Sequence, residues 1–394
     1  MMRIGIDATC WWNHRGFGRF TRELLKAMFA DGNGHELCLF VDREPAEEMD
    51  GRQMKIVRVH TSHTTTKAAV AYGSRSLPDI LAFRRAALAE SLDIFFFPAV
   101  YSWFPLARGL NSVVTLHDAI AEHYPNLIFP NPWRRILWSL KVHLACRQAG
   151  RILTVSESAK AEIMKYIKLD PIRIDVTSEA ADSRFRPDND VRSIAEAQKR
   201  VGLPPKGRYL IYVGGFAPHK NLTRMLDGFS RILVKDSTAD LHLALVGDPA
   251  GDGFLSNYRE LAGKVSANVR LRDRVHFTGY VSDEDLIKLY SGAVAAIMPA
   301  LSEGFGLPAI EALACATPVL ASDRSAVPEV IGEAGLLFDP TNPDAIAASI
   351  ERIVCDHDIR DSLQAKAILR AQQFTWHEAA ERTYASLETC HAER

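Results

Sequence analysis

The stretch SEGFGLPAIEALACATPVLAS, residues 302–322, carries two carboxylates eight positions apart, at Glu303 and Glu311. Glu303 stands in a glycine-rich turn (303–306), and Pro308 fits the first turn of a helix, where its missing N–H would be unpaired anyway. The pattern predicts Glu311 in that same first turn, near the positive end of the helix dipole and beside unpaired backbone N–H groups. Such a turn can hold a molecule that is anionic in one part and rich in hydroxyl groups in another.

On both sides of this turn, short β-rich runs alternate with helical patterns, which is typical of parallel sheets in α/β proteins. A polar segment from Asp182 to Gly207 predicts a domain boundary. We therefore expect two doubly wound, Rossmann-like α/β domains facing a cleft, at 1–185 and 186–374, and a Thr/Ser-rich surface loop at 61–77. The predicted strands cover residues 3–7, 36–41, 54–59, 94–98, 112–116, 151–155, 209–213, 242–246, 275–278, 295–298, 319–322 and 336–338.

Composition limits the class of protein. The chain has 394 residues, 47% of them apolar and 24% charged, which suits a two-domain α/β protein. A net charge of −1 argues against a nucleic-acid binder. Six cysteines without CxxC spacing predict free thiols in a reducing compartment. With neither a signal peptide nor a spanning apolar run visible, we expect a cytoplasmic protein.

Two loops in the first half carry polar groups at predicted strand ends, where open α/β sheets bind ligands. Arg15, Gly16 and Gly18 follow the first strand, and glycines there let the backbone approach an anion at a helix N-terminus. An ordinary tight turn is the alternative. His117 follows the strand at 112–116 and can bond hydroxyl groups in the cleft, although a structural histidine fits the pattern equally well.

The segment VGGFAPHKN (213–221) follows the first strand of the second half. Lys220 lies where a helix begins, so its ammonium and the helix N–H groups can meet one anion. A solvated surface lysine is the alternative. The acids at 283–285 match a DxD metal motif, but an N-cap at Ser282 and the helix dipole explain them. We expect no metal site.

Segment 131–168 is the most basic, with eight basic and two acidic residues. Its first part, NPWRRILWSLK (131–141), mixes cations with tryptophans. Such a helix can lie on an anionic membrane surface as a peripheral contact. A partly buried helix with a solvated basic face is the other interpretation.

Taken together, these loops resemble the retaining glycosyltransferases of family four, which have the two-domain GT-B fold. The resemblance covers essentially the whole chain. EGFGLPAIEALA is similar to the family's E-x7-E motif, and VGGFAPHKN is similar to its VGR-x4-K segment. In the first half, TLHD resembles the segment with the family's cleft histidine, and RGFGRF resembles its first glycine loop. FTWHEAAERTYASLE (374–388) is similar to the family's C-terminal helix, here 375–394, which crosses back onto the first domain.

The resemblance implies an acceptor-side domain at 1–185 and a donor-binding domain at 186–374. Glu311 would bind the ribose of a nucleoside-diphosphate sugar and Glu303 the transferred sugar. Lys220 would neutralise the leaving diphosphate, and His117 would bond the sugar ring. Further donor contacts are implied for Gly304, Phe305, Gly306, Leu307, Gly215, Tyr280 and Val281, and an acceptor or phosphate loop for Arg15, Gly16 and Gly18.

One departure from the family pattern concerns Gly215, where the family usually has arginine. Arg15, Arg19 and His219 are candidates to replace that charge. The resemblance implies no cofactor beyond the nucleotide-sugar co-substrate, and we expect metal independence because Lys220 and helix N-termini carry the positive charge.

The segments DATCWWNHRGFGRFTREL (7–24) and YVGG (212–215) look most like mannosyltransferases that use GDP-mannose, although UDP-glucose and UDP-N-acetylglucosamine stay open as donors. We expect transfer of a hexose to a saccharide or lipid-linked saccharide in bacterial surface polysaccharide or lipopolysaccharide synthesis, at the inner face of the membrane. A sugar-nucleotide epimerase on the same fold and a non-catalytic sugar-nucleotide-binding protein are the alternatives.

Overall fold

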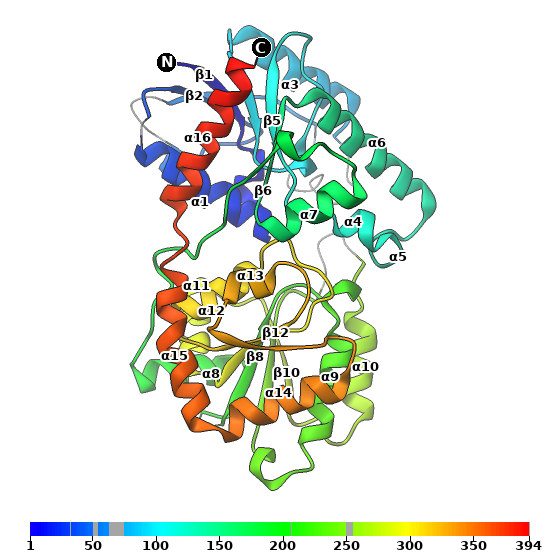
Figure 1. The fold of residues 1–394 in the computed structure, drawn as a ribbon, viewed down its shortest axis with the longest axis vertical. Coiled ribbons are helices and arrows are strands. Elements are labelled where there is room, and N and C mark those ends of the chain that lie inside the picture. The colour runs from blue at the N-terminus through cyan, green and yellow to red at the C-terminus, as the bar shows by residue number, and fades with distance from the viewer. Residues whose placement is uncertain (32, 50–53, 63–74, 206, 250–254, 394) are drawn as a thin grey trace. The chain divides into compact units, whose positions relative to one another are not determined.

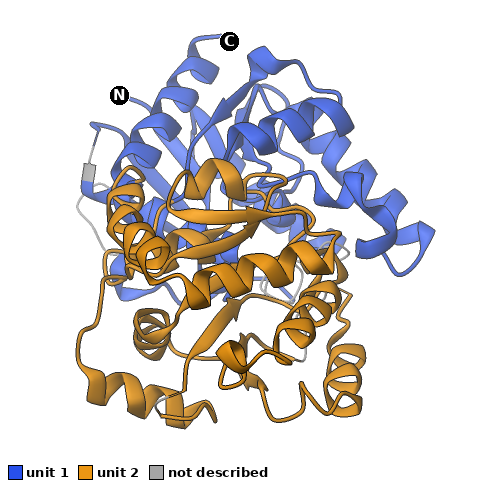
Figure 2. Ribbon diagram, turned by 60° about the horizontal axis from the view of Figure 1, so that its bottom comes forward, with its two compact units in different colours: residues 1–179, 375–394 blue, residues 180–374 orange. Residues whose placement is uncertain are grey.

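The computed structural model describes residues 1–31, 33–49, 54–62, 75–205, 207–249 and 255–393 (Figure 1), so most of the predicted loop at 61–77 lies outside the described residues. The chain divides into two compact units, coloured separately in Figure 2. Unit 1 holds residues 1–179 and 375–394, and unit 2 holds residues 180–374. Each unit is built on one parallel sheet.

The sheet of unit 1 has the strand order β3-β2-β1-β4-β5-β6-β7. Strand β4 reads Ile-Phe-Phe-Phe, and all four residues are buried, because helices cover both faces of a central parallel strand. Its partner β1 pairs in the register Ile4↔Ile94. The strands are β1 (Arg3–Asp7), β2 (Glu36–Val41), β3 (Met54–Arg58), β4 (Ile94–Phe97), β5 (Asn111–Thr115), β6 (Arg151–Thr154) and β7 (Ile174–Val176).

Helices lie on both faces of this sheet. Helix α1 packs against α16, and Figure 1 shows α6 on the other side of unit 1 from α16. Capping groups mark the starts: Ser156 precedes α7, and its hydroxyl accepts the N–H of Ala159 at 2.9 Å. The helices are α1 (Gly16–Asp31), α3 (Leu77–Ala89), α4 (Ile120–His123), α5 (Pro125–Ile128), α6 (Pro132–Gln148), α7 (Glu157–Tyr166) and α16 (Trp376–Ala392).

Helix α16 comes from the end of the chain, yet it is part of unit 1. Its Tyr384 hydroxyl donates to the carbonyl of Met28 in α1 at 2.9 Å. Its Ser386 hydroxyl donates to the Asp175 carboxylate in β7 at 2.6 Å. These contacts connect the two ends of the sequence within one core.

The sheet of unit 2 has the order β10-β9-β8-β11-β12-β13, and its core strand β9 is buried along its whole length. The strands are β8 (Tyr209–Val213), β9 (His242–Val246), β10 (Val275–Gly279), β11 (Ala295–Met298), β12 (Val319–Ser322) and β13 (Gly335–Phe338). The helices are α8 (Val191–Arg200), α9 (Leu222–Ile232), α10 (Tyr258–Ala267), α11 (Asp283–Gly292), α12 (Leu307–Ala314), α13 (Val327–Ile331), α14 (Pro343–Cys355) and α15 (His357–Ala371).

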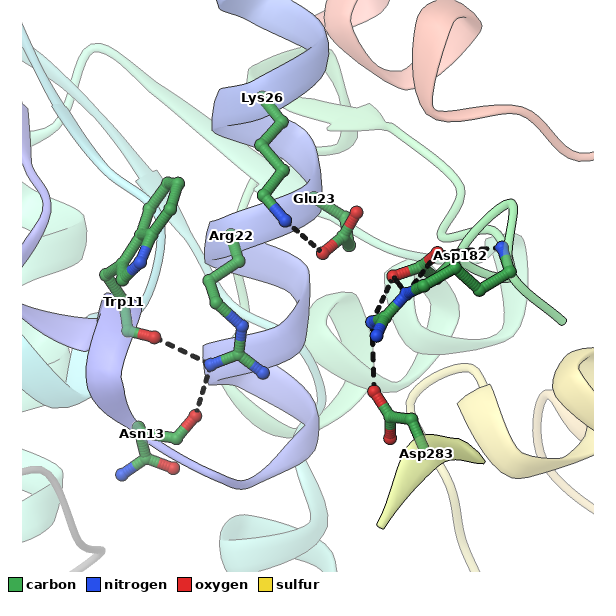
Figure 3. Close-up of polar contacts among 8 residues, drawn as sticks. Trp11, Asn13, Arg22, Glu23, Lys26, Asp182 and Asp283 are labelled. Carbon is green, nitrogen blue, oxygen red and sulfur yellow. Dashed lines mark hydrogen bonds and ion pairs between the residues drawn. The ribbon is translucent and has the colours of Figure 1, made fainter. Parts of the chain in front are cut away.

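Both strand orders run outward from a central pair in two directions, so the prediction of two doubly wound α/β domains is confirmed. The chain enters unit 2 after Glu179, earlier than the boundary predicted after residue 185. The reason is local: the Arg184 guanidinium donates to Asp283 of unit 2 at 3.0 Å (Figure 3), and the ring of Phe185 lies 6.3 Å from that of Tyr290.

The polar segment 182–207 is also more than a connection, because it contains helix α8, which packs on α11 of unit 2. The charged side chains of α8 are exposed, and its buried positions are Ala197 and Gln198.

Candidate functional site

Strands β8 and β11 pair at the point where the strand order of unit 2 reverses. Loops after such a pair form the usual ligand site of a doubly wound sheet. Lys220 follows β8 and Glu303 follows β11, and the Lys220 ammonium donates to both carboxylate oxygens of Glu303, at 2.7 and 2.8 Å. Two residues that come from separate sequence motifs therefore form one ion pair at this end of the sheet.

The ion pair is largely shielded from water. The side chains of Lys220 and Glu303 are 22% and 11% exposed. An ammonium is a common phosphate-binding group, and a carboxylate accepts hydrogen bonds from hydroxyl groups. The arrangement can therefore bind an anion and a polyol next to each other.

Asn221 holds the Lys220 loop in place. It adopts the left-handed backbone conformation, with φ +61°, which asparagine tolerates better than most residues. Its buried side-chain amide donates to the carbonyls of Pro299 at 3.0 Å and Pro340 at 2.7 Å. These carbonyls follow β11 and β13, so one side chain joins three loops at the carboxyl end of the sheet.

Ser325, in the loop after β12, holds the backbone of Glu303. The Glu303 N–H donates to the Ser325 hydroxyl at 3.0 Å, and that hydroxyl donates to the Glu303 carbonyl at 2.7 Å. Ser325 was not identified from the sequence as part of the site, and Asn221 was given no role of its own within the segment 213–221. No local pattern marks them, because their partners lie on other loops.

Helix α12 begins at Leu307, after Gly306, whose φ of +97° strongly favours glycine. Pro308 lies in the first turn, as predicted. The prediction that Glu311 also lies in the first turn is wrong. It is the fifth residue of α12, because a full turn of about 3.6 residues precedes it. Its side chain is only 3% exposed.

The other predicted donor contacts lie on loops of the same unit, after β11 and after the edge strand β10. Gly304 and Phe305 precede α12, and the buried Phe305 ring lies 5.5 Å from that of Phe374. After β10, Tyr280 is 70% exposed and Val281 is buried.

Gly215, at the position of the expected arginine, is exposed. A Cβ atom at Gly215 would meet no heavy atom within 4 Å, so the backbone there leaves room for a side chain. His219 does not supply the missing charge. Burial, together with the nearby Lys220 charge, lowers the pKa of His219 to about 3. His219 is therefore neutral near pH 7, which rules it out as a replacement cation.

The acids at 283–285 occupy the first turn of α11, after the N-cap Ser282, whose hydroxyl accepts the N–H of Asp285 at 3.2 Å. Each acid also pairs with a basic side chain: Asp283 with Arg184, Glu284 with Lys288, and Asp285 with Arg200. Capping and ion pairing thus account for this motif.

In unit 1, the predicted glycine loop opens α1. A Cβ atom at Gly18 would lie 2.1 Å from the carbonyl oxygen of Asn13, so only glycine fits there. Arg22, nearly two turns into the helix, donates to the carbonyls of Trp11 at 2.6 Å and Asn13 at 2.8 Å (Figure 3). The N–H of Arg15 donates to the Asn13 side chain at 2.8 Å. The glycine pattern here has a steric reason within the loop, and Gly16 begins the helix.

His117 follows β5, and both of its ring nitrogens have polar neighbours within unit 1. Its Nε2 lies 3.0 Å from the carbonyl oxygen of Pro98, so Nε2 must carry the hydrogen, because a carbonyl only accepts. Its Nδ1 lies 3.4 Å from the Glu179 carboxylate. The ring also stands edge-on to Phe20. The structural interpretation of this histidine, left open by the sequence, has direct support.

A cluster of polar side chains near the carboxyl ends of β1 and β4 was not identified from the sequence. Buried Asp7 pairs with Arg75 at 2.9 Å, and the Lys141 ammonium donates to the carbonyl of Tyr101 at 2.5 Å. Burial and the Arg75 charge lower the pKa of Lys141 to about 8. Burial also raises the pKa of Glu122, in α4, to about 7. The available signal was a charged residue, Asp7, directly ending an apolar strand.

Comparisons with known proteins divide the chain as the structure does. Residues 14–184 match the family described as "Glycosyltransferase Family 4", and residues 193–370 match "Glycosyl transferases group 1". Together these two matches span most of unit 1 and most of unit 2.

Among curated relatives, an O-antigen chain mannosyltransferase B from Escherichia coli is 29% identical over 381 residues, covering 93% of this chain and 94% of the relative. A D-inositol 3-phosphate glycosyltransferase from Frankia alni is 29% identical over 290 residues, covering 72% of this chain and 66% of the relative.

Solved structures share the fold. A sucrose-phosphate synthase from Thermosynechococcus elongatus superposes with a TM-score of 0.76 at 20% identity, covering 100% of both chains. Anabaena HepE in complex with UDP-glucose gives a TM-score of 0.74 at 16% identity, covering 99% of this chain and 100% of that one.

Proposed function

This chain belongs to glycosyltransferase family four, and on that premise we propose that it moves a hexose from a nucleoside-diphosphate sugar to a hydroxyl acceptor, with retention at the anomeric carbon. The observation that carries the proposal is the shielded Lys220–Glu303 ion pair at the switch point of unit 2. That pair offers a cation for a diphosphate and a carboxylate for sugar hydroxyls at the site where doubly wound sheets bind nucleotides.

In this proposal unit 2 binds the donor. The backbone N–H groups at the start of α12, around Gly306 and Leu307, face the negative charge of the diphosphate together with Lys220. Glu303 accepts hydrogen bonds from the transferred sugar. The buried Glu311, one turn further along α12, bonds the ribose hydroxyls. Lys220 is then shared between Glu303 and the donor.

The reaction forms one bond and breaks one bond at the same carbon. The acceptor oxygen bonds to the anomeric carbon as the bond from that carbon to the diphosphate oxygen breaks. The acceptor oxygen bonds on the face from which the diphosphate departs, so configuration is retained, and the acceptor proton passes to the leaving diphosphate. Lys220 and the α12 N–H groups stabilise the charge that develops on the diphosphate, which is the kind of term that dominates many enzymatic rates.

We propose mannose from GDP-mannose as the transferred sugar, supported by the similarity to the E. coli O-antigen mannosyltransferase across almost the whole chain. On the same basis the acceptor is a saccharide or lipid-linked saccharide of a bacterial surface polysaccharide or lipopolysaccharide, elongated at the cytoplasmic face of the membrane. Unit 1 is assigned to the acceptor.

The test combines donor binding with product analysis. We expect GDP-mannose and GDP to raise the melting temperature more than UDP-glucose or UDP-N-acetylglucosamine. Glu311→Gln should weaken donor binding, whereas Glu333→Gln, an exposed glutamate of unit 2, should leave it unchanged. Transfer to lipid-linked saccharide acceptors should persist in EDTA, and the new linkage should show the donor's anomeric configuration by NMR.

Other outcomes point elsewhere. A free, epimerised sugar nucleotide released from donor alone would identify an epimerase. Donor binding without turnover on any saccharide acceptor would favour a binding protein. An inverted linkage would refute the retaining mechanism while leaving the transferase assignment intact.

A further inference from the structure

Helix α6 of unit 1 (Pro132–Gln148) is apolar on two opposite sides. Its inner side is buried against the unit through Trp138, Val142, Ala145 and Cys146. Its outer side carries five large apolar side chains that are between 42% and 76% exposed: Trp133, Ile136, Leu137, Leu140 and Leu144.

The five exposed side chains form one stripe. They follow the 133, 136, 137, 140, 144 spacing of one helix face, and at 3.6 residues per turn they lie within an arc of about 100°. Monomeric soluble proteins rarely leave a continuous apolar surface of this kind uncovered, and where they do it usually marks an interaction site. Figure 1 shows α6 at the outer side of unit 1.

The charges beside the stripe all have one sign. At 3.6 residues per turn, exposed Arg147 lies within the arc of the stripe and half-buried Arg134 lies next to its edge, whereas Arg135 lies on the inner side. The helix sequence PWRRILWSLKVHLACRQ contains no aspartate or glutamate. A helix with tryptophan and leucine on one face and arginine beside it is suited to the boundary between lipid headgroups and acyl chains.

We propose that the outer face of α6 docks unit 1 onto an anionic lipid bilayer, with the helix lying in the plane of the interface. Apolar side chains from Trp133 to Leu144 would enter the headgroup boundary, and Arg134 and Arg147 would pair with lipid phosphates. The helix lies on the membrane and does not cross it: in the described part of the chain, no helix is long and apolar enough to span a bilayer.

Charge favours lipid over a second copy of this chain as the occupant. In a twofold dimer through this face, the arginines beside one stripe would meet those of the other. Helix α6 has no acidic residue to pair with them. Anionic headgroups supply the opposite charge along the whole helix.

The inner side of the same helix contacts groups at the carboxyl end of the sheet. The indole N–H of Trp138 donates to Glu122 at 2.8 Å, and Lys141 donates to the carbonyl of Tyr101. Because α6 lies in the crossover from β5 to the parallel strand β6, it starts from that same end. Docking would therefore bring the start of α6, at this end of the sheet, next to lipid headgroups, where a lipid-linked acceptor is found. The acceptor step rests on the proposed function, but docking does not.

The test is sedimentation of the full chain with vesicles made of equal parts phosphatidylglycerol and phosphatidylcholine. We expect binding that is stronger than to phosphatidylcholine alone and that weakens with salt. The triple variant Trp133→Ser/Leu137→Ser/Leu140→Ser should bind at least about tenfold more weakly. Arg134→Glu/Arg147→Glu should lose the preference for phosphatidylglycerol.

A matched control changes three exposed apolar residues of unit 2, Val191→Ser/Val234→Ser/Leu369→Ser, and should bind like the wild type. Since all replaced residues are exposed, both triple variants should keep the wild-type melting temperature. Donor binding, measured without vesicles, should be unchanged in both, so a failure of docking is distinguishable from a failure of the proposed function.

Three results would overturn the proposal. The wild type could fail to sediment with phosphatidylglycerol vesicles, or the α6 triple variant could bind as well as the control. In the third, the wild type would elute as a dimer that the α6 variant converts to a monomer, which would assign this face to self-association.

Discussion

Replacing Lys220 by methionine removes the ammonium that donates to both oxygens of Glu303, while keeping a side chain of similar length. The Glu303 carboxylate, 11% exposed, would then lack its cation. Breaking a fully buried ion pair costs about 3–5 kcal/mol, but Lys220 is 22% exposed and water can partly replace it. We therefore expect a loss of about 1–3 kcal/mol in the free energy of unfolding of unit 2.

The same change should act separately on catalysis. If Lys220 stabilises the leaving diphosphate, its loss removes a charge interaction of about 2.7–4 kcal/mol from the transition state, or roughly a 10²–10³-fold decrease in kcat. GDP release from GDP-mannose in the presence of acceptor measures this effect, and urea denaturation measures the first.

A double-mutant cycle separates the two roles. Glu303→Gln and Lys220→Met/Glu303→Gln complete the cycle, and the double variant should recover part of the lost stability, because no unpaired carboxylate remains. It should not recover kcat. Lys235→Met serves as control, since Lys235 donates to both oxygens of Glu351 in the same unit with more exposed side chains. If the double variant regained both stability and kcat, the pair would be structural only and the catalytic role of Lys220 would be wrong.

Three further predictions use single positions. Gly215→Arg should tighten donor diphosphate binding about 5–50-fold, measured by titration calorimetry. The melting temperature should change little, because the position has room for a side chain. No gain in affinity would mean that the diphosphate binds elsewhere. Gly306→Ala should lower the stability of unit 2 by about 1–2 kcal/mol in denaturation experiments, because alanine disfavours a φ of +97°; an unchanged midpoint would contradict the assigned strain. Glu122→Gln removes a buried carboxyl group. Burial raises the pKa of Glu122 from 4.5 to about 7, so between these pH values the folded state holds a proton that the unfolded state has lost. The contribution of this group to wild-type stability therefore falls as the pH rises from 4.5 to about 7. The variant should therefore match the wild type near pH 4.5 and gain about 1–3 kcal/mol above pH 7 by paired denaturation curves, and an equal difference at both pH values would refute the assignment.

Strand positions could be predicted well because burial leaves a local signature. Short apolar runs such as Tyr209–Val213 and Ala295–Met298 agree with β8 and β11 to the residue. The short strand β7 and helix α8 were not predicted, since β7 has three residues and α8 lies in a polar segment. Whether these two segments form regular structure depends on packing against neighbouring elements, and a short or polar sequence does not reveal that packing.

At the site, residue type and short-range spacing were enough to select Lys220, Glu303 and Glu311 as candidates. The burial and the charge state of side chains at the site could not be predicted from residue type and spacing. Glu311 is buried beyond the first turn because Gly306 starts the helix at Leu307. His219 is neutral because surrounding side chains exclude water from it. Both facts depend on what packs nearby in space.

Amino-acid type and periodicity in this chain specify where apolar strands alternate with helices and which loops carry charged groups, because these properties depend on neighbours within a few positions. The meeting of Lys220 with Glu303, 83 residues apart, depends on β8 pairing with β11 rather than with β10. The links from Asn221 and Ser325 depend on the same strand order. Strand order results from packing of whole sheets and helices, and so only the tertiary structure brings these loops into one site.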